Sequence, residues 1–548
     1  MIHPFGCKAA VRRSMVLVLM VCLLWMAGCF RNAGIGGTGE IVVPTERLQQ
    51  IQPFNAGTFT LPPPASQPIK IARPTTVQLN IERARQLALH NNLDLHVDLI
   101  NPSLAKETLS QAEAQFESTF FGDAGYVNTH QDTYSSLFNS RSEVVNGDIG
   151  VNVPLQTGGT AALELPFNRY QINNSFDTLN PAYESDLQAS FSIPVLRGAG
   201  VFYNTQQIRV AFYEFQASLA TAKLQVTQVL RDVDTAYWLL YAARQELIVQ
   251  QKNLDLSHVQ ADRARRQVAA QTAAQVEIVR ADSNVAAAVE QVIAAQNDVL
   301  THQRDLKRVM NDPEIGIESD TSLIPSTLPD ATEFRLDPEK LVSVAMHDRM
   351  DLLATELRIA EEASNVRIAH SDLLPLVTLS YQYDQNGLGP SFGSSYQQLG
   401  EGKFANNTIG VHVEIPIGND VAKSELRAAL DRRLLQLSTK QLQQATIKEA
   451  VLNDLDTLNL TWQQILAARQ RVALDNRLVA AEVRQFELGL RTSTDVAIAQ
   501  NELASARSAE VRALTQYQIA QVDIAYDTGS ILGSNRVVWQ PIAAGGKE

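Results

Sequence analysis

VLNDLDTLNLTWQQILAARQRV, residues 451–472, carries the pattern that decides the fold. Its apolar side chains follow the alternating three- and four-residue spacing of a coiled-coil seam. The seam positions are Val451, Leu455, Leu458, Trp462, Ile465 and Val472, and Arg469 is the polar position among them. The surrounding stretch, 421–528, contains no proline and one glycine, Gly489. At about 1.5 Å per residue, the part before Gly489 gives roughly 100 Å of helix. We therefore predict a long helical hairpin that turns back within residues 486–496.

Composition and charge exclude some classes of function. The 548 residues include 46 basic and 59 acidic side chains, which gives a net charge of −13. This balance argues against a nucleic-acid partner, because phosphates attract a basic surface. The apolar content of 45% is ordinary for a folded protein. No run reaches the ~18 apolar residues of a membrane-spanning helix.

The N-terminal residues indicate export. Arg12 and Arg13 precede an apolar stretch over 15–25, as in a signal peptide. Ala27 and Gly28 lie directly before Cys29, which resembles a bacterial lipoprotein signal. That resemblance implies removal of residues 1–28 and acylation of Cys29, with palmitate as a typical acyl group. The alternative is an ordinary cleavage site at which the cysteine occurs by chance.

Residues 29–75 are rich in proline and glycine and are predicted to be a flexible tether. Gly34, Gly36 and Gly39 match the spacing of a dinucleotide-binding loop, but no predicted strand precedes them and no helix follows. We therefore predict no cofactor there. Removal of the signal peptide leaves Cys29 as the only cysteine, so the mature chain forms no internal disulfide.

An internal repeat organises the rest of the chain. Residues in 79–112 recur with the same spacing in 336–369. The matched pairs are Leu79 and Leu336, Glu82 and Glu339, Ala88 and Ala345, His90 and His347, Asp94 and Asp351, Leu95 and Leu352, and Ala112 and Ala369. Each copy is predicted to begin with a helix of roughly thirty-five residues. We place repeat 1 at 76–326, repeat 2 at 334–530 and a tail at 531–548.

Strands follow the first helix of each repeat, because apolar and polar residues alternate there. The apolar positions are Leu187, Ala189, Phe191, Ile193 and Val195 in the first copy, and Val377, Leu379, Tyr381, Tyr383, Ile409, Val411, Val413, Ile415 and Ile417 in the second. The glycine-rich residues 386–402 are predicted to connect the second pair. A second long hairpin is predicted over 204–312, which contains neither glycine nor proline, with its turn near Thr272.

Two copies of helix, strands and long hairpin, with Gly489, Arg491, Thr492 and Asp495 at the second tip, resemble the TolC-like outer membrane efflux protein family and its lipid-anchored branch. The resemblance implies an α+β protein that forms a homotrimer. Strands of three copies would close one β-barrel in the outer membrane, and the helices would continue it as a coiled-coil tunnel through the periplasm. The implied partners are outer membrane lipid, a periplasmic adaptor and an inner-membrane transporter. The implied function is the exit duct of a tripartite efflux pump or type I secretion system.

An insertion departs from the family pattern of four strands per copy. Residues 149–167 add two alternating runs around Gly158 and Gly159 in the first repeat. The alternatives are a protomer with six strands in the barrel wall and an extracellular hairpin outside the barrel.

The hairpin tips depart from the family as well. In that family, an arginine and a tyrosine of the second tip hold an aspartate of the first tip and close the tunnel. A gap-free alignment of Thr492 with Thr272 places Arg491, Phe486 and Gln275 at these positions, so the arginine alone is kept. The family's two aspartate rings correspond to Asp495 and Ile498. The other interpretation of Arg491 and Asp495 is a local i, i+4 ion pair at a helix start.

Other functions fit less well. The nine histidines are scattered, and no nucleophile, base or metal-ligand set has the required spacing, so we predict neither an enzyme nor a metal site. A lipid-anchored periplasmic coiled-coil adaptor or scaffold is the main alternative, because it too would carry long hairpins. The duplicated strands argue against it.

Overall fold

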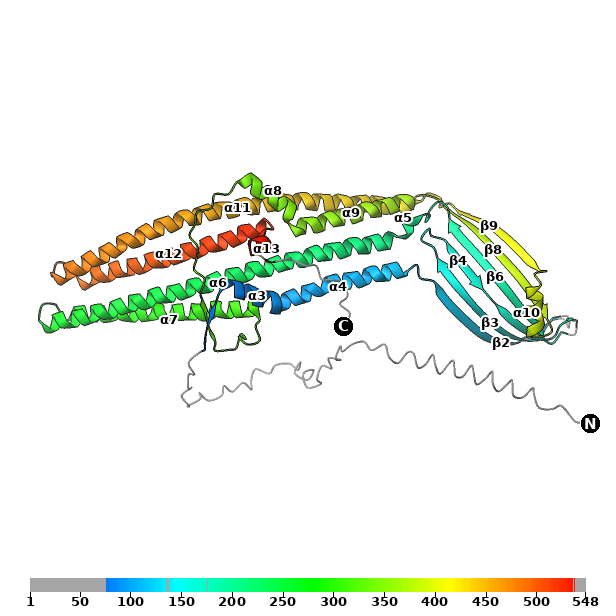
Figure 1. Cartoon of the computed structure of the whole chain (residues 1–548), viewed down its shortest axis with the longest axis horizontal. Coiled ribbons are helices and arrows are strands. Elements are labelled where there is room, and N and C mark those ends of the chain that lie inside the picture. The colour runs from blue at the N-terminus through cyan, green and yellow to red at the C-terminus, as the bar shows by residue number, and fades with distance from the viewer. Residues whose placement is uncertain (1–74, 135–137, 175, 536, 538–548) are drawn as a thin grey trace, which may run out of the picture. The chain divides into compact units, whose positions relative to one another are not determined.

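The computed structural model describes residues 75–134, 138–174, 176–535 and 537. The chain divides into two units at Ala72 and Arg73, and all described residues lie in the second. Within this unit, strands occupy one end and the tips of two helical hairpins occupy the other (Figure 1). Among the described residues, no helix combines the length and the apolar content needed to cross a membrane.

Two hairpins of long helices form most of the unit. The first consists of α6 (Gln206–Ala269) and α7 (Val276–Met310), and the second of α11 (Asp420–Glu487) and α12 (Ser493–Asp527). The 68 residues of α11 give a helix of about 100 Å. Both predicted hairpins are therefore present in the structure, with turns at the predicted places.

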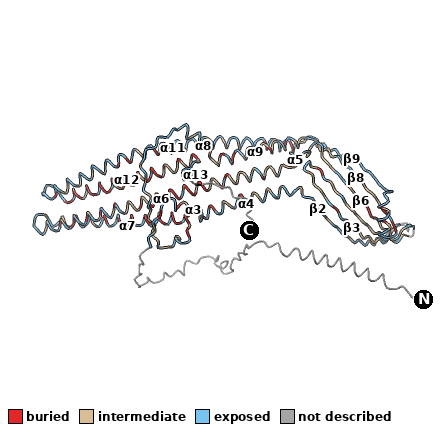
Figure 2. The backbone as a smooth tube through the Cα atoms, viewed as in Figure 1, coloured by how far each residue is buried: buried red, intermediate tan, exposed pale blue. Residues whose placement is uncertain are grey.

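The coiled-coil spacing identifies the buried side of these helices. Val451 and Ile465 are fully buried, and Leu455 and Leu458 are nearly so. Trp462 packs on Tyr517 of α12, with ring centroids 5.6 Å apart. The polar seam position, Arg469, reaches Glu510 of α12 at 3.5 Å and stays half-exposed. Figure 2 shows buried residues along the facing sides of the helices.

The helix predicted at the start of each repeat is interrupted, which corrects the sequence prediction. The first consists of α3 (Ile81–Asn91) and α4 (Leu93–Ala114), and the second of α8 (Pro338–Asp348) and α9 (Met350–Ser371). The breaks fall at Asn92 and Arg349. The Asn92 side chain accepts a hydrogen bond from Leu95 N and donates one to Val309 O. It therefore caps the start of α4 and bonds to a backbone carbonyl of α7. This local capping outweighs continuous helix formation.

Two short strands and a short helix pack against the long helix α6. Strand β1 (Thr76–Leu79) pairs in parallel with β7 (Ser322–Pro325). The buried Tyr237 hydroxyl donates to Leu79 O and accepts from Thr327 N, so it ties β1 and the residues after β7 to α6. The first residues of the predicted tail form α13 (Ile531–Ser534) and bury Ile531 and Leu532.

The remaining strands differ in length and form one antiparallel sheet with the order β2-β3-β4-β6-β8-β9. Strand β5 also pairs with β3 and β6. The strands are β2 (Thr119–His130), β3 (Arg141–Pro154), β4 (Thr160–Glu164), β5 (Phe167–Ile172), β6 (Ala182–Pro194), β8 (Leu376–Gly389) and β9 (Ala405–Glu414). Because β4 and β5 both lie between β3 and β6, they share one position, and the sheet has six strand positions.

The inserted hairpin of residues 149–167 belongs to this sheet. The turn between β3 and β4 is closed by hydrogen bonds between Leu155 N and Gly159 O and between Gly158 N and Leu155 O. Gly158 has a φ of +92°, a conformation that side chains disfavour. Val151 pairs with Leu163, and Leu163 pairs with Ala189 of β6. The insertion therefore separates β2 from β6 and lies within the sheet.

The segment predicted as a connection at 386–402 contains a helix, α10 (Phe392–Gly400). It lies against β6 and β8 at the end of the sheet far from the hairpins (Figure 1). A side chain at Gly387 would meet Ser395 O at 2.1 Å, so glycine permits this close approach. The hydroxyls of Ser185 and Ser395 are 2.8 Å apart. The glycines thus mark a packing surface, and their number led the sequence prediction to a loop.

Candidate functional site: the hairpin tips and the helix junction

Glycine shapes the second tip. Helix α11 ends at Glu487, Leu488 is its C-cap, and Gly489 follows with a φ of +74°. Its amide donates to Phe486 O, and Leu490 N donates to Gln485 O, which satisfies carbonyls at the helix end. A Cβ at Gly489 would meet nothing within 4 Å, so the backbone conformation alone selects glycine.

The predicted ring residue Asp495 caps its own helix. Thr492 is the N-cap of α12, and its hydroxyl accepts from Asp495 N at 3.4 Å. Asp495 Oδ2 accepts from the backbone N and the hydroxyl of Thr492, both at 2.9 Å. These hydrogen bonds lower the pKa of Asp495, because they stabilise the carboxylate. Asp495 therefore remains a half-buried negative charge at the tip.

Arg491 bonds backward along α11. Its Nε lies 3.4 Å from Glu482 Oε2 and donates to Gln485 Oε1 at 3.1 Å. No ion pair joins Arg491 to Asp495 in the described chain, so the predicted local i, i+4 pair is wrong. The reason is that the capping interaction with Thr492 turns the Asp495 carboxylate toward the helix N-terminus.

The first tip uses a different turn. Gln271 has a φ of 58° and occupies the position that Gly489 occupies in the second tip, directly after the C-cap of its helix. Helix α7 then starts after Gln275, which is exposed and whose side chain makes no capping hydrogen bond. By helix start, Gln275 corresponds to Thr492. The gap-free alignment of Gln275 with Asp495 is therefore wrong, because the first turn is one residue longer.

The acidic residue that links the two tips is Glu277. Its Oε2 accepts a hydrogen bond from the hydroxyl of Ser493, and its Oε1 lies 2.8 Å from Arg280 Nη1. A second contact between the hairpins joins Arg263 of α6 to Glu487 of α11 at 3.5 Å. Sequence reasoning missed Glu277, although a carboxylate in the first turn of α7 is a common feature of helix starts.

Phe486 and Ile498 have opposite environments. Phe486 is buried, with 5% of its surface exposed. Ile498, in the place of the family's second aspartate ring, is 52% exposed. Together with the exposed Leu488 and Leu490, it gives the second tip an apolar surface.

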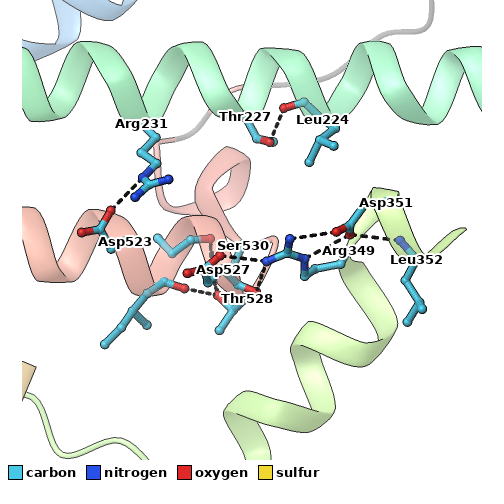
Figure 3. A network of polar contacts seen from close by, with 12 residues as sticks. Leu224, Thr227, Arg231, Arg349, Asp351, Leu352, Asp523, Asp527, Thr528 and Ser530 are labelled. Atoms are coloured by element: carbon cyan, nitrogen blue, oxygen red, sulfur yellow. Dashed lines mark hydrogen bonds and ion pairs between the residues drawn. The ribbon is translucent and has the colours of Figure 1, made fainter. Parts of the chain in front are cut away.

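Away from the hairpin tips, a network of charged residues connects α6, α9 and α12 (Figure 3). Arg349 Nη1 lies 2.8 Å from Asp527 Oδ1, and Arg349 Nη2 lies 2.8 Å from Asp351 Oδ2. Arg231 of α6 pairs with Asp523 of α12 at 2.8 Å. The interactions raise the pKa of Arg349, against an opposing effect of burial. These ion pairs join three helices, α6, α9 and α12.

Asp454 of α11 adds a proton-binding group to this network. Burial, and the neighbouring Asp527 and Asp523 carboxylates, raise its pKa to about 8, while Arg231 opposes the shift. The neutral carboxyl can donate a hydrogen bond to Asp527. We therefore expect pH to act on the junction through Asp454.

The buried carboxylate of Asp234 has a structural partner. Arg85 donates two hydrogen bonds to the buried Asp234, at 2.7 and 2.9 Å, and joins α3 to α6. Burial raises the pKa of Asp234, and Arg85 counteracts this effect. In the part of the chain that the structure describes, no group of three or more acidic, cysteine or histidine side chains could hold a metal ion. Cys29 lies outside the described residues.

Comparisons with known proteins agree on one family. Residues 341–530 match the model of the outer membrane efflux protein family. The chain is 24% identical over 376 residues to the outer membrane efflux protein BepC of Brucella suis biovar 1 (strain 1330), an alignment that covers 64% of this chain and 77% of BepC.

Two solved structures share the fold. The outer-membrane channel OprN superposes with a TM-score of 0.62 and 15% identity, over 82% of this chain and 90% of OprN. The outer membrane channel CmeC of Campylobacter jejuni superposes with a TM-score of 0.62 and 14% identity, over 82% of this chain and 86% of CmeC. The matched segment, the relative and the two structures agree: the chain is similar to outer membrane efflux proteins, and residues 341–530 carry the match to that family.

Proposed function

We propose that this protein is an outer membrane efflux channel that gives solutes a passive route out of the cell. The observation that carries the proposal is a sheet with one apolar and one polar face, continued by two long helical hairpins. BepC, OprN and CmeC are all described as outer membrane efflux proteins or channels, so a channel is favoured over an enzyme.

The two faces follow from the strand register. Residues that are Cα partners in antiparallel strands point to the same side of the sheet. Val151, Leu163, Ala189 and Tyr383 therefore share one face, in register across β3, β4, β6 and β8. The adjacent residues, such as Asn152 and Gln382, point to the other. This arrangement suits lipid outside and water inside.

A homotrimer would complete the barrel. Within the described residues, β2 and β9 each pair on one side only, so each copy offers two free edges. Lipid does not tolerate free edges, because their backbone groups would lack hydrogen bonds. Helix α4 also exposes an apolar stripe at coiled-coil spacing, formed by Leu93, Val97, Ile100 and Leu104. Three copies would join edge to edge, and these helices would pack as the wall of a periplasmic tunnel.

The proposed organisation keeps two repeats, 76–326 and 334–530, preceded by a signal peptide at 1–28 and a tether at 29–75. Cys29 would be acylated and inserted into outer membrane lipid. Mass spectrometry of the mature protein tests this, because an unmodified N-terminus or a different start excludes it. Cys29→Ala should still form trimers, since the barrel provides most of the attachment.

The tips are the proposed docking and gating end, where a periplasmic adaptor and an inner-membrane transporter would connect. Three copies of Asp495 would form an acidic ring there. In planar bilayers, Asp495→Ala should reduce cation selectivity, and Gln275→Asp should lower conductance by adding a carboxylate at the first tip. Unchanged values in both variants would assign these residues a local role only.

Purified full-length protein tests the proposal as a whole. A trimer that resists heat in detergent and conducts ions in planar bilayers is the expected result. A lipid-anchored adaptor or scaffold, the alternative function, would give neither barrel stability nor conductance. Co-expression with candidate adaptors and a cross-linking assay would then identify the partner.

A further inference from the structure

The polar face of the sheet is strongly acidic. The register places seven carboxylates on it, namely Asp123, Asp148, Glu164, Glu184, Asp186, Asp384 and Glu414. Among the described strands, no lysine or arginine shares this face, because Arg141 and Arg169 point to the other side. Glu414 is paired with Arg197 at 3.3 Å. The other six form no ion pair within the described residues.

The inserted strands contribute to this charge directly. Asp148 of β3 lies opposite Asp123 of β2, so two carboxylates face each other without a cation between their strands. Glu164 of β4 lies opposite Gly150 and Gln188. Asp186 and Asp384 receive hydrogen bonds from Asn386 and Gln382, at 3.0 and 2.8 Å, and these neutral donors leave the negative charge in place.

The same strands change the size of the barrel. Without β3, β4 and β5, four strand positions would remain, β2, β6, β8 and β9. Three copies would then supply twelve positions, whereas three copies of the observed sheet supply eighteen. Barrel diameter grows almost linearly with strand number, and barrels of 16–18 strands enclose an open aqueous channel. The insertion therefore widens the barrel about one and a half times.

We propose that the β3–β5 insertion makes the outer-membrane end of this duct a wide, acidic exit that admits bulky cationic and neutral solutes and disfavours anions. The proposal rests on the trimeric channel proposed above. Carboxylates in rings attract cations and repel anions, and threefold symmetry repeats each of the six unpaired groups three times. The diameter of the barrel selects solutes by size, and the carboxylates select them by charge.

The position of the insertion in the wall is tested first, in a background in which Cys7, Cys22 and Cys29, the three cysteines of the chain, are replaced by serine. Val151→Cys and Asn152→Cys are neighbours that face opposite sides of β3. In proteoliposomes, a charged, water-soluble maleimide should label Asn152→Cys and spare Val151→Cys. Equal labelling of both residues would place the insertion outside the wall and overturn the proposal.

Selectivity is tested by removing the two inserted carboxylates together. Asp148→Asn with Glu164→Gln should lower the cation-to-anion permeability ratio at least about twofold, measured as the reversal potential in a salt gradient. Glu318→Gln, in the exposed segment between α7 and β7, is the matched control and should leave the ratio unchanged. A ratio that is the same in all three proteins would overturn the acidic exit.

Width is measured by polymer exclusion from the barrel side of the bilayer. Poly(ethylene glycol) of increasing size should lower the wild-type conductance up to a radius about one and a half times that of a variant lacking residues 131–181, which joins β2 directly to β6. If that variant does not fold, the wild-type cutoff is compared with porins of known strand number, and a cutoff in the range of small barrels overturns the proposal. Absence of trimers and of conductance would instead contradict the channel function itself.

Discussion

Arg231 of α6 and Asp523 of α12 form an ion pair of 2.8 Å between the two halves of the chain, which are far apart in sequence. The guanidinium of Arg231 also lies over the ring of Tyr526, 4.8 Å from its centroid. One turn away along α12, Asp527 holds Arg349. Helix α12 therefore carries, on one stretch, the charges that fasten it both to the first hairpin and to the start of α9.

Breaking the contact between the halves should destabilise the helical part. We expect Arg231→Met to cost about 1 kcal/mol, because it leaves the Asp523 carboxylate partly buried without its partner. Thermal unfolding of the purified protein measures the loss. Arg265→Met is the control, since Arg265 is also on α6 but its pairs with Asp262 and Asp282 are exposed. Equal losses in the two variants would contradict a specific role for Arg231.

The junction should respond to pH through Asp454. Its pKa in the folded protein is about 8, well above the ordinary value of 3.8. A raised pKa gives stability that is fully present below the ordinary value and is lost as pH rises through 8. We expect the unfolding temperature of the wild type to fall between pH 5 and pH 8.5 more steeply than that of Asp454→Asn, whose amide does not titrate.

The control for this prediction is Asp456→Asn, two residues away on α11 and exposed. It should keep the wild-type slope of unfolding temperature against pH. If Asp454→Asn has the wild-type slope as well, the pH dependence originates elsewhere in the protein.

The contact between Ser493 and Glu277 should restrain the tips. Glu277→Gln weakens the acceptor and removes the pair with Arg280, so we expect the second hairpin to separate more often and single-channel conductance to rise. Ser493→Ala should have the same effect, because it removes the donor. Glu290→Gln, an exposed change further along α7, serves as the control. Conductance that stays constant in all three variants would show that the tips are held by other contacts.

The apolar face of the insertion should not tolerate charge. Val151→Arg would place a guanidinium in lipid, at a cost of about 2–4 kcal/mol near the bilayer midplane. We expect a strong loss of trimer yield in membranes, measured by native electrophoresis. Asn152→Arg, one residue along β3 on the polar face, should assemble normally. Normal yield from Val151→Arg would argue that β3 does not contact lipid.

Periodic features of the chain could be predicted from the sequence, and local ones could not. The seam through Val451 and Ile465 repeats buried positions over many residues, and the alternation through Val411 and Tyr381 repeats apolar positions on one face of the sheet. Both periods are visible in the sequence. Asn92 breaks a helix through two side-chain hydrogen bonds, one of them to a residue more than two hundred positions away. Periodicity contains no information about such contacts.

The turns at the hairpin tips could likewise be predicted only in part from the sequence. Gly489 could be assigned to a turn, since its backbone conformation favours glycine. Gln271 performs the same task without glycine, so the first turn could not be aligned with the second by spacing alone. The role of Glu277 depends on Ser493 in the other hairpin, which no local pattern connects to it.

The free edges of β2 and β9 have a genetic consequence. If the barrel closes only when three chains meet, one chain with a defective β9 can still attach to two normal chains through its β2 edge. That assembly keeps a gap, and it removes the normal chains from use. In a cell that expresses both versions, such a mutation would be dominant, whereas a mutation that prevents a chain from folding at all would be recessive.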